Sequence, residues 1–177
     1  VLFRSGAEHP HRVDRRDAFI GVDDVEFAVV LTAGGIGVLA TAQSANQTVD
    51  WAAYNGSAGN SHYSKLKQIN TGNVNEIGIA WTTTLDTNRG MEATPIVVDG
   101  VMYTIAADNN VFALDAATGK TLWRYTAKLD PIVKEMFYQS ASRGVTVGRG
   151  KVYLGTLDGR MVALDQKTGK ELWSTQL

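Results

Sequence analysis

The chain has 177 residues, a formal net charge of −1 and no cysteine. The chain therefore lacks the excess of basic residues that is typical of proteins binding nucleic acid or anionic membranes, and nothing suggests either partner. The lack of cysteine excludes disulfides and thiolate metal sites within this sequence, and it does not decide between an oxidising and a reducing compartment.

Residues 1–26 are polar and charged, and no strand or helix period runs through them, so we expect a disordered leader. Residues 27–42, FAVVLTAGGIGVLATA, are uncharged, short for a membrane span, and end in the small-x-small pattern of a signal-peptidase site. We interpret this run as the apolar region of a secretion signal. That interpretation predicts a periplasmic protein, and a membrane anchor or a buried strand pair are the alternatives.

A polar linker, residues 43–50, leads to the part of the chain that has regular patterns. Residues 51–55 and 77–84 are apolar and β-rich, and a loop rich in Ser, Asn and Gly separates them. We predict a strand in each.

One stretch occurs twice further along the chain. Residues 100–123, GVMYTIAADNNVFALDAATGKTLW, align without a gap with residues 150–173, GKVYLGTLDGRMVALDQKTGKELW, at a constant offset of 50. The identical pairs include Tyr103/Tyr153, Asp108/Asp158, Asp115/Asp165, Gly119/Gly169 and Trp123/Trp173. A self-similar period of this size indicates a repeat architecture.

Each repeat predicts four short strands separated by turn residues. In the first repeat these runs are 93–98, 102–106, 111–115 and 121–126, and in the second they are 144–148, 152–156, 161–165 and 171–177. Four antiparallel strands about every 50 residues are typical of a β-propeller blade, so we predict an all-β fold with blades at about 92–126 and 142–177. Two blades cannot close a ring, and we therefore expect a piece of a longer protein.

Both repeats contain the pattern Ala-x-Asp-x-x-x-Gly-x-x-x-Trp, from Ala113 to Trp123 and from Ala163 to Trp173. We expect each Trp to fill the seam between neighbouring blades, while Asp and a glycine with positive φ set the hairpin before it.

These motifs resemble those of a known family. Residues 51–177 are similar to the N-terminal part of the PQQ-dependent alcohol dehydrogenases, the periplasmic quinoproteins of methanol and ethanol type, which fold as eight-bladed propellers. The segments that carry the resemblance are WAAYNG (51–56), YSKLKQIN (63–70), RGMEATP (89–95), SRGV (142–145) and GTLDGR (155–160).

Three polar residues are predicted to meet at one end of the propeller channel. Glu92 and Arg143 precede the innermost strands of the two blades, and Thr156 ends the strand that runs antiparallel to the second of these. Such a cluster suits a flat, anionic quinone. The residues alone equally allow an ion pair between blades and a threonine bonded to backbone. The resemblance implies that Glu92, Arg143 and Thr156 contact PQQ.

Two further positions need an interpretation. Asp158 occupies the same turn as Asp108 in the other repeat, which favours a turn-forming role over a catalytic one. Phe137 and Tyr138 stand where many relatives have adjacent cysteines. They cover the quinone ring with an aromatic face, or adapt the pocket to another substrate, or belong to a surface loop between the blades.

The resemblance implies a dehydrogenase that oxidises alcohols, or sugars and polyols, and passes electrons to cytochrome c or a membrane quinone. PQQ would lie over Ca²⁺ or a lanthanide, with the metal ligands and the catalytic base outside this sequence, so this chain alone would be inactive. A homodimer is compatible with the family. The alternatives are a non-catalytic propeller that acts as an assembly scaffold, and a PQQ-binding sensor.

Overall fold

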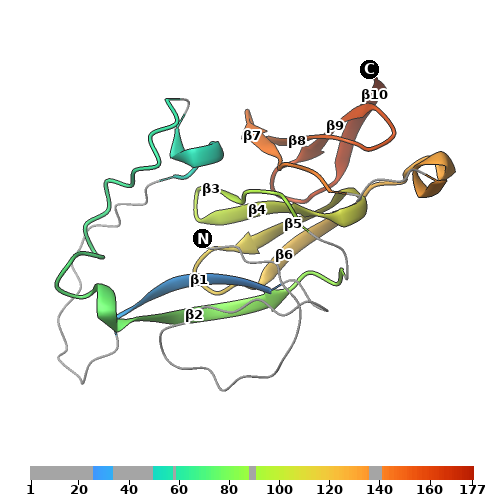
Figure 1. Cartoon of the computed structure of the whole chain (residues 1–177). Coiled ribbons are helices and arrows are strands. Elements are labelled where there is room, and N and C mark those ends of the chain that lie inside the picture. Colours follow the sequence, from blue (N-terminus) through green and yellow to red (C-terminus); the bar gives the residue numbers. More distant parts are fainter. Residues whose placement is uncertain (1–25, 34–49, 58, 88–90, 136–140) are drawn as a thin grey trace.

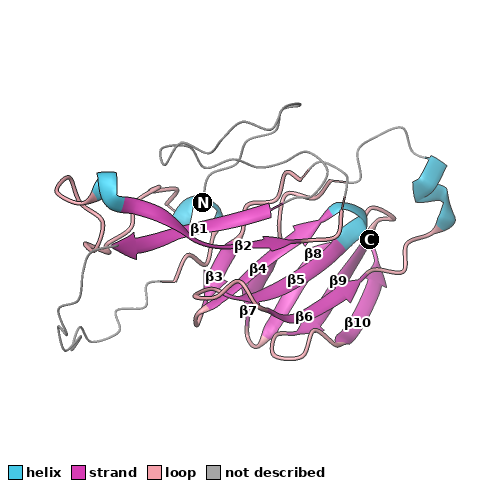
Figure 2. Cartoon of the chain, turned by 90° about the horizontal axis from the view of Figure 1, so that it is seen from below, coloured by secondary structure: helices cyan, strands magenta, loops and turns pink. Residues whose placement is uncertain are grey.

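The computed structural model describes residues 26–33, 50–57, 59–87, 91–135 and 141–177. Within these ranges the chain forms three antiparallel sheets, which lie one above another in Figure 1. Four short 3-10 turns, cyan in Figure 2, lie in the connections between strands, namely η1 (Tyr54–Gly56), η2 (Val74–Glu76), η3 (Ala107–Asn109) and η4 (Pro131–Glu135). None of the helical segments in the described residues is long and apolar enough to cross a membrane.

The two repeats form two four-stranded sheets, as the sequence predicts. The first sheet has the order β3 (Ile96–Val98), β4 (Val101–Ala106), β5 (Asn110–Asp115) and β6 (Thr121–Thr126). The second sheet consists of β7 (Thr146–Gly148), β8 (Lys151–Gly155), β9 (Arg160–Asp165) and β10 (Glu171–Gln176) in the same order. Their registers also agree, because Tyr103 pairs with Ala113 in the first sheet as Tyr153 pairs with Ala163 in the second. The predicted all-β blades are confirmed.

A third sheet pairs β1 (Glu26–Ala33) with β2 (Ile77–Thr84), antiparallel. The predicted strand at 77–84 is therefore confirmed. β1 occupies the start of the apolar run 27–42, and the secretion signal, the membrane anchor and the buried strand pair all stay predictions for this run. The leader up to residue 25 and residues 34–49, which include most of the predicted linker, lie outside the described residues.

The predicted strand at 51–55 is wrong. Only Trp51 pairs with another segment: it exchanges two backbone hydrogen bonds with Val97 of β3, at 2.8 and 3.0 Å, and η1 follows at Tyr54. Asn55 has a φ of 60°, which breaks the extended conformation that a strand needs. Trp51 therefore covers part of the edge of β3 that does not pair with β4; β3 is the edge strand that follows Pro95.

The hairpin turns of the two sheets are built in the same way. Asp115 accepts hydrogen bonds at its Oδ1 from the backbone of Ala117 and Thr118 and from the Thr118 hydroxyl, at 3.1, 2.8 and 2.7 Å. The Asp165 side chain repeats this pattern with residues 167 and 168. The Thr118 hydroxyl is the main cause that lowers the pKa of Asp115, and the equivalent hydroxyl lowers that of Asp165. The repeated Asp and Thr thus shape the turn.

The main core lies between the first and the second sheet. Alternate residues of β4 point to opposite faces, so that Tyr103 and Ile105 join a buried cluster with Val152 and Leu164 of the second sheet. Met102, on the other face of β4, joins a second cluster on the side of β2. The first sheet is therefore covered on both faces.

Tryptophan side chains connect each sheet to the next. The Trp123 ring lies against Gly169, and its Nε1 donates to the carbonyl of Gln166 at 3.0 Å. Trp81 of β2 lies in the same way on Gly119 and donates to the carbonyl of Ala116 at 3.2 Å. The seam role of Trp123 is confirmed. Trp81 is a second docking tryptophan, which the sequence pattern missed because the Ala-x-Asp-x-x-x-Gly motif does not precede it.

Candidate functional site

The starts of β3 and β7 lie at the same end of the two sheets. Residue 96 pairs with residue 103 at the beginning of β3, and residue 146 pairs with residue 153 at the beginning of β7. The innermost strands thus begin where β4 and β8 end. The backbone N–H of Thr94 donates to the carbonyl of Arg143 at 3.3 Å, which joins the two starts. We call this end of the sheets the mouth end.

Glu92 and Arg143 meet at the mouth end, as the sequence predicts. Arg143 Nε lies 3.3 Å from Glu92 Oε2, and this ion pair links the first sheet to the second. The Arg143 side chain is 89% exposed and that of Glu92 is 43% exposed. An exposed pair contributes little to stability. The guanidinium keeps its two Nη groups outside this contact, so it can still bind the oxygens of an anion in two places.

Thr156 follows β8 and is 8% exposed. If the antiparallel pairing of β7 with β8 is continued by three residues, Thr156 stands opposite Arg143. The backbone of Thr156 therefore lies at the mouth end. Its hydroxyl donates to Asp158 Oδ1 and accepts from the Arg160 backbone N–H at 3.0 Å. No hydrogen bond or ion pair joins it to Glu92 or Arg143 in the part of the chain that the structure describes. The structure thus brings two of the three predicted side chains together and bonds the third within its own turn.

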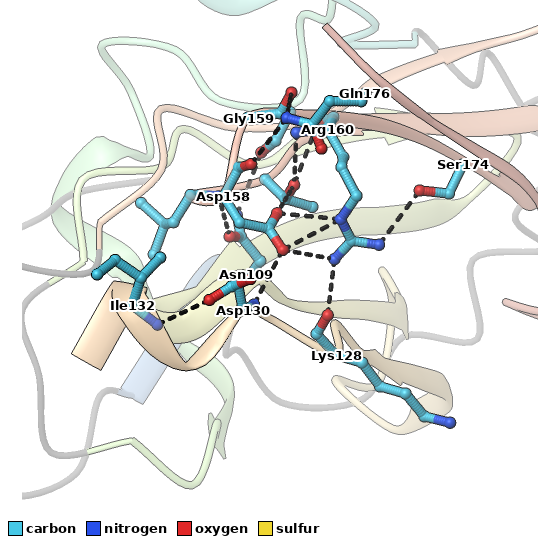
Figure 3. Close-up of polar contacts among 12 residues, drawn as sticks. Asn109, Lys128, Asp130, Ile132, Asp158, Gly159, Arg160, Ser174 and Gln176 are labelled. Atoms are coloured by element: carbon cyan, nitrogen blue, oxygen red, sulfur yellow. Dashed lines mark hydrogen bonds and ion pairs between the residues drawn. The ribbon is translucent and has the colours of Figure 1, made fainter. Parts of the chain in front are cut away.

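Asp158 does more than form a turn, because it is half of a clamp drawn in Figure 3. Arg160 Nε donates to both Asp158 carboxylate oxygens, each at 3.1 Å, and Arg160 Nη2 donates to the carbonyl of Lys128 at 2.7 Å. Asp158 Oδ2 also accepts from the backbone N–H of Asp130 at 3.0 Å. The pair thereby fastens the connection between the sheets to the turn that contains Thr156.

Electrostatics within this clamp favour the charged forms. Burial would raise the pKa of Asp158, whose side chain is 8% exposed, but hydrogen bonds from Arg160 and Thr156 outweigh it and lower the pKa to about 2. The hydrogen bond to Asp158 in turn raises the pKa of Arg160. An aspartate that is fully ionised and fully bonded at neutral pH is a structural anion and a poor general base.

Asn109 links the same turn to the first sheet, and sequence reasoning missed it. The residue is 1% exposed; its Nδ2 donates to the carbonyl of Gly155 at 3.2 Å, and its Oδ1 accepts from the Leu157 N–H at 2.8 Å. The one sign of this role in the sequence is a difference between the two repeats, because the second repeat has Gly159 where the first has Asn109.

The described residues contain no group of three or more His, Cys, Asp and Glu side chains that could hold a metal ion. Phe137 and Tyr138 lie outside the described ranges, so their predicted roles stay predictions. Among the described residues, the mouth end offers the exposed Arg143 guanidinium beside the Glu92 carboxylate, which suits the recognition of an anionic ligand.

Comparisons with known proteins agree with this architecture. Residues 51–175 match the family model described as the glucose/ethanol/alcohol dehydrogenase β-propeller domain, PQQ type. The dehydrogenase subunit of an alcohol dehydrogenase (quinone) from Gluconobacter oxydans is 46% identical over 108 residues, which is 60% of this chain and 14% of the relative. The quinohemoprotein alcohol dehydrogenase ADH-IIG of Pseudomonas putida is 49% identical over 96 residues, or 54% of this chain and 13% of the relative.

Solved structures show the same similarity in three dimensions. The structure of that Pseudomonas putida enzyme has a TM-score of 0.68 and 46% identity, and covers 72% of this chain and 19% of its own. A europium-containing methanol dehydrogenase has a TM-score of 0.65 and 37% identity, and covers 72% of this chain and 23% of its own. The chain thus spans less than a quarter of each of these relatives. It belongs to the PQQ family of glucose, ethanol and alcohol dehydrogenase β-propeller domains.

Proposed function

We propose that this chain supplies the first part of the PQQ site in a dehydrogenase that oxidises alcohols, or sugars and polyols. Glu92 and Arg143 would contact the cofactor from the mouth end of the first and the second sheet. In the complete protein the electrons would pass to cytochrome c or a membrane quinone, in the periplasm. The dimer compatible with the family stays part of this proposal.

The meeting of Glu92 and Arg143 is the observation that carries the proposal. The two residues come from different repeats, and they lie side by side on the open end of the sheets with the Arg143 side chain 89% exposed. The matching family model is of PQQ type, which supports an anionic, planar cofactor as the ligand. A guanidinium binds carboxylate or quinone oxygens in a planar, two-point contact that a lysine cannot make.

In this proposal, the backbone of Thr156 lies at the cofactor site, and its hydroxyl contributes little to binding. That hydroxyl is already bonded to Asp158 and to the Arg160 backbone. A contact with the cofactor would require it to exchange one of these bonds or to use a remaining lone pair. We therefore expect Thr156 to contribute less to cofactor affinity than Arg143.

PQQ would supply the two-electron acceptor of the reaction, and Ca²⁺ or a lanthanide would supply the Lewis acid. A europium-containing relative makes a lanthanide a reasonable candidate. The described residues do not include a fitting set of metal ligands, so the proposal assigns no metal-binding residue and no catalytic base to this chain. Its own residues would bind and orient the cofactor.

A second candidate function is supported by the same contact. If Glu92 and Arg143 only fasten two sheets together, the mouth end needs no ligand, and the propeller acts as an assembly scaffold. The bonded hydroxyl of Thr156 favours this alternative as well. A PQQ-binding sensor would share the cofactor site but lack turnover.

The test is to titrate the purified apo-protein, expressed from its complete reading frame, with PQQ and Ca²⁺ or La³⁺, and to follow dye-linked oxidation of alcohols and sugars. We expect PQQ to bind at one equivalent and to support turnover. Binding without turnover would favour the sensor. A folded protein that binds no PQQ under either metal would overturn the proposal in favour of the scaffold.

A further inference from the structure

We infer that Asn109 is a positioning residue, which fixes the mouth end of the second sheet relative to the first and thereby sets cofactor affinity. The inference rests on the proposed function, and it adds a residue that does not itself contact the cofactor. Asn109 lies in η3, the turn between β4 and β5, at the mouth end of the first sheet.

The geometry of the amide supports this role. Asn109 Nδ2 donates to the carbonyl of Gly155 and Oδ1 accepts from the N–H of Leu157, so the side chain bonds the backbone on either side of Thr156. At 1% exposure the amide is shielded from water, and losing these bonds would leave buried polar groups unpaired. Both bonds cross from the first sheet to the second, as does the Glu92–Arg143 pair.

The backbone conformation at Asn109 does not explain why this residue is an asparagine. Its φ is 55° and that of the preceding Asp108 is 57°, which is a left-handed conformation that asparagine tolerates and glycine prefers. The second repeat has Gly159 at the equivalent position, with a φ of 79°. The conformation of the turn therefore needs no amide, and the asparagine is explained by the two bonds it makes to the other sheet.

Other contacts hold the turn of the second sheet that contains Thr156 and Asp158. Asp158 and Arg160 tie it to the connection between the sheets, and the Gln176 side chain donates to the carbonyls of Asp158 and Gly159, each at 3.2 Å (Figure 3). These contacts shape the turn and fasten it to its own sheet and to the incoming chain. The two side-chain hydrogen bonds of Asn109 join this turn to the turn between β4 and β5.

The matched pair of variants is Asn109→Gly and Trp123→Phe. Asn109→Gly keeps the turn conformation and removes both bonds at the mouth end. Trp123→Phe keeps an aromatic ring on Gly169 and removes the indole bond to Gln166, which crosses between the same two sheets at the opposite end. Both variants weaken the interface between the sheets, and only the first alters the mouth end.

The experiment uses the complete protein and three measurements: the free energy of unfolding, hydrogen exchange of the Leu157 amide, and the dissociation constant of PQQ with Ca²⁺. For Asn109→Gly we expect the exchange of this amide to accelerate at least about tenfold. We also expect the dissociation constant to rise about tenfold, as for other residues that orient a binding group. Trp123→Phe should leave the dissociation constant within about twofold of the wild-type value.

The outcomes separate this inference from the proposed function. If the wild type binds PQQ and Asn109→Gly accelerates exchange without changing affinity, the positioning role is overturned and the cofactor site stands. If Trp123→Phe weakens binding as much as Asn109→Gly, the effect is general loosening and the inference also fails. If the wild type does not bind PQQ, the proposed function fails and takes the inference with it.

Discussion

The two four-stranded sheets share a sequence repeat and a register, yet they are buried to different extents. The first sheet packs against β2 on one face and against the second sheet on the other. Trp123 of β6 is consequently 9% exposed, whereas its equivalent Trp173 of β10 is 42% exposed. Both rings stand in the same way over a tyrosine, with centroids 6.0 and 6.1 Å apart.

This difference separates what a repeat encodes from what its neighbours provide. The strands, the turns and the orientation of the tryptophan arise within each repeat, because they depend on contacts inside one sheet. The burial of that tryptophan depends on the following unit, as expected when each repeat contacts only its neighbours. Stability should therefore differ between equivalent positions, although the local structure does not.

The largest expected effect comes from truncating the two equivalent tryptophans. Trp123→Ala should lower the free energy of unfolding by about 3–5 kcal/mol, because it removes a buried aromatic ring from the core between the sheets. Trp173→Ala should cost about half as much in this chain, because the ring is already partly in water. Urea denaturation followed by circular dichroism measures both. Equal costs would contradict the difference in burial.

Glycine substitutions test the same packing between the sheets from the side of the second sheet, where the Trp123 ring lies against Gly169. Gly169 has a φ of 68°, and a Cβ there would lie 2.4 Å from Trp123 Cε3. Gly150 has a φ of 70° and no atom within 4 Å of such a Cβ. Gly150→Ala should cost about 1 kcal/mol for the left-handed conformation, and Gly169→Ala about 3 kcal/mol because Trp123 must also move. If the two costs were the same, the tryptophan would not be seated on Gly169.

The second sheet should have a pH-dependent stability that comes from Asp158, which pairs with Arg160 where the first repeat has Asn110. The pKa of Asp158 is about 2, below its ordinary value of 3.8, so its contribution is complete above about pH 4 and is lost as the pH falls towards 2. We expect Asp158→Asn to lower stability by roughly 1–2 kcal/mol at pH 7 and by much less at pH 2.

Arg160→Gln is the companion variant for this measurement, because it removes the partner of Asp158 and the first repeat has Asn110 at the equivalent position. We expect it to make the loss of stability between pH 4 and pH 2 smaller than in the wild type, because the hydrogen bonds from Arg160 help to lower the pKa of Asp158. Unfolding by urea at a series of pH values provides the test. An Asp158→Asn profile parallel to that of the wild type would show that the clamp with Arg160 is not formed.

The smallest effect is expected at Thr104, whose equivalent in the second sheet is Leu154. Thr104 is fully buried in β4, and its hydroxyl has no hydrogen-bond partner within the described residues. Thr104→Val keeps the shape and removes the unpaired hydroxyl, so it should raise stability by up to about 1 kcal/mol. A loss of stability in thermal unfolding would mean that this hydroxyl is bonded after all.

Sequence reasoning predicted the two sheets, because strand periodicity, turn residues and a gapless repeat all pointed to the same fold. It predicted the meeting of Glu92 and Arg143 from strand direction alone. It failed at residues 51–55, where Asn55 adopts a positive φ, and it did not find Trp81, which docks on Gly119 without a motif of its own.

The clamp between Asp158 and Arg160 and the bridging role of Asn109 were not predicted, for a common reason. Each depends on side-chain hydrogen bonds formed in or against one turn, and strand patterns carry no information about such bonds. Thr156 lies at the predicted end of β8, but its hydroxyl bonds to Asp158. Asn109 was visible only as a mismatch with Gly159, which gains meaning once the two turns are known to touch.

The central claim is that the mouth end between the two sheets binds PQQ through Arg143. The most direct test compares the dissociation constants of PQQ for Arg143→Ala and Lys167→Ala in the complete protein. Both variants remove one exposed positive charge, and Lys167 lies in the β9–β10 turn at the other end, where the first repeat already has Ala117. We predict that Arg143→Ala weakens binding at least about tenfold, the loss expected for a charge-assisted contact, and that Lys167→Ala leaves it unchanged. Equal affinity of the two variants and the wild type would contradict the assignment of the cofactor to this end.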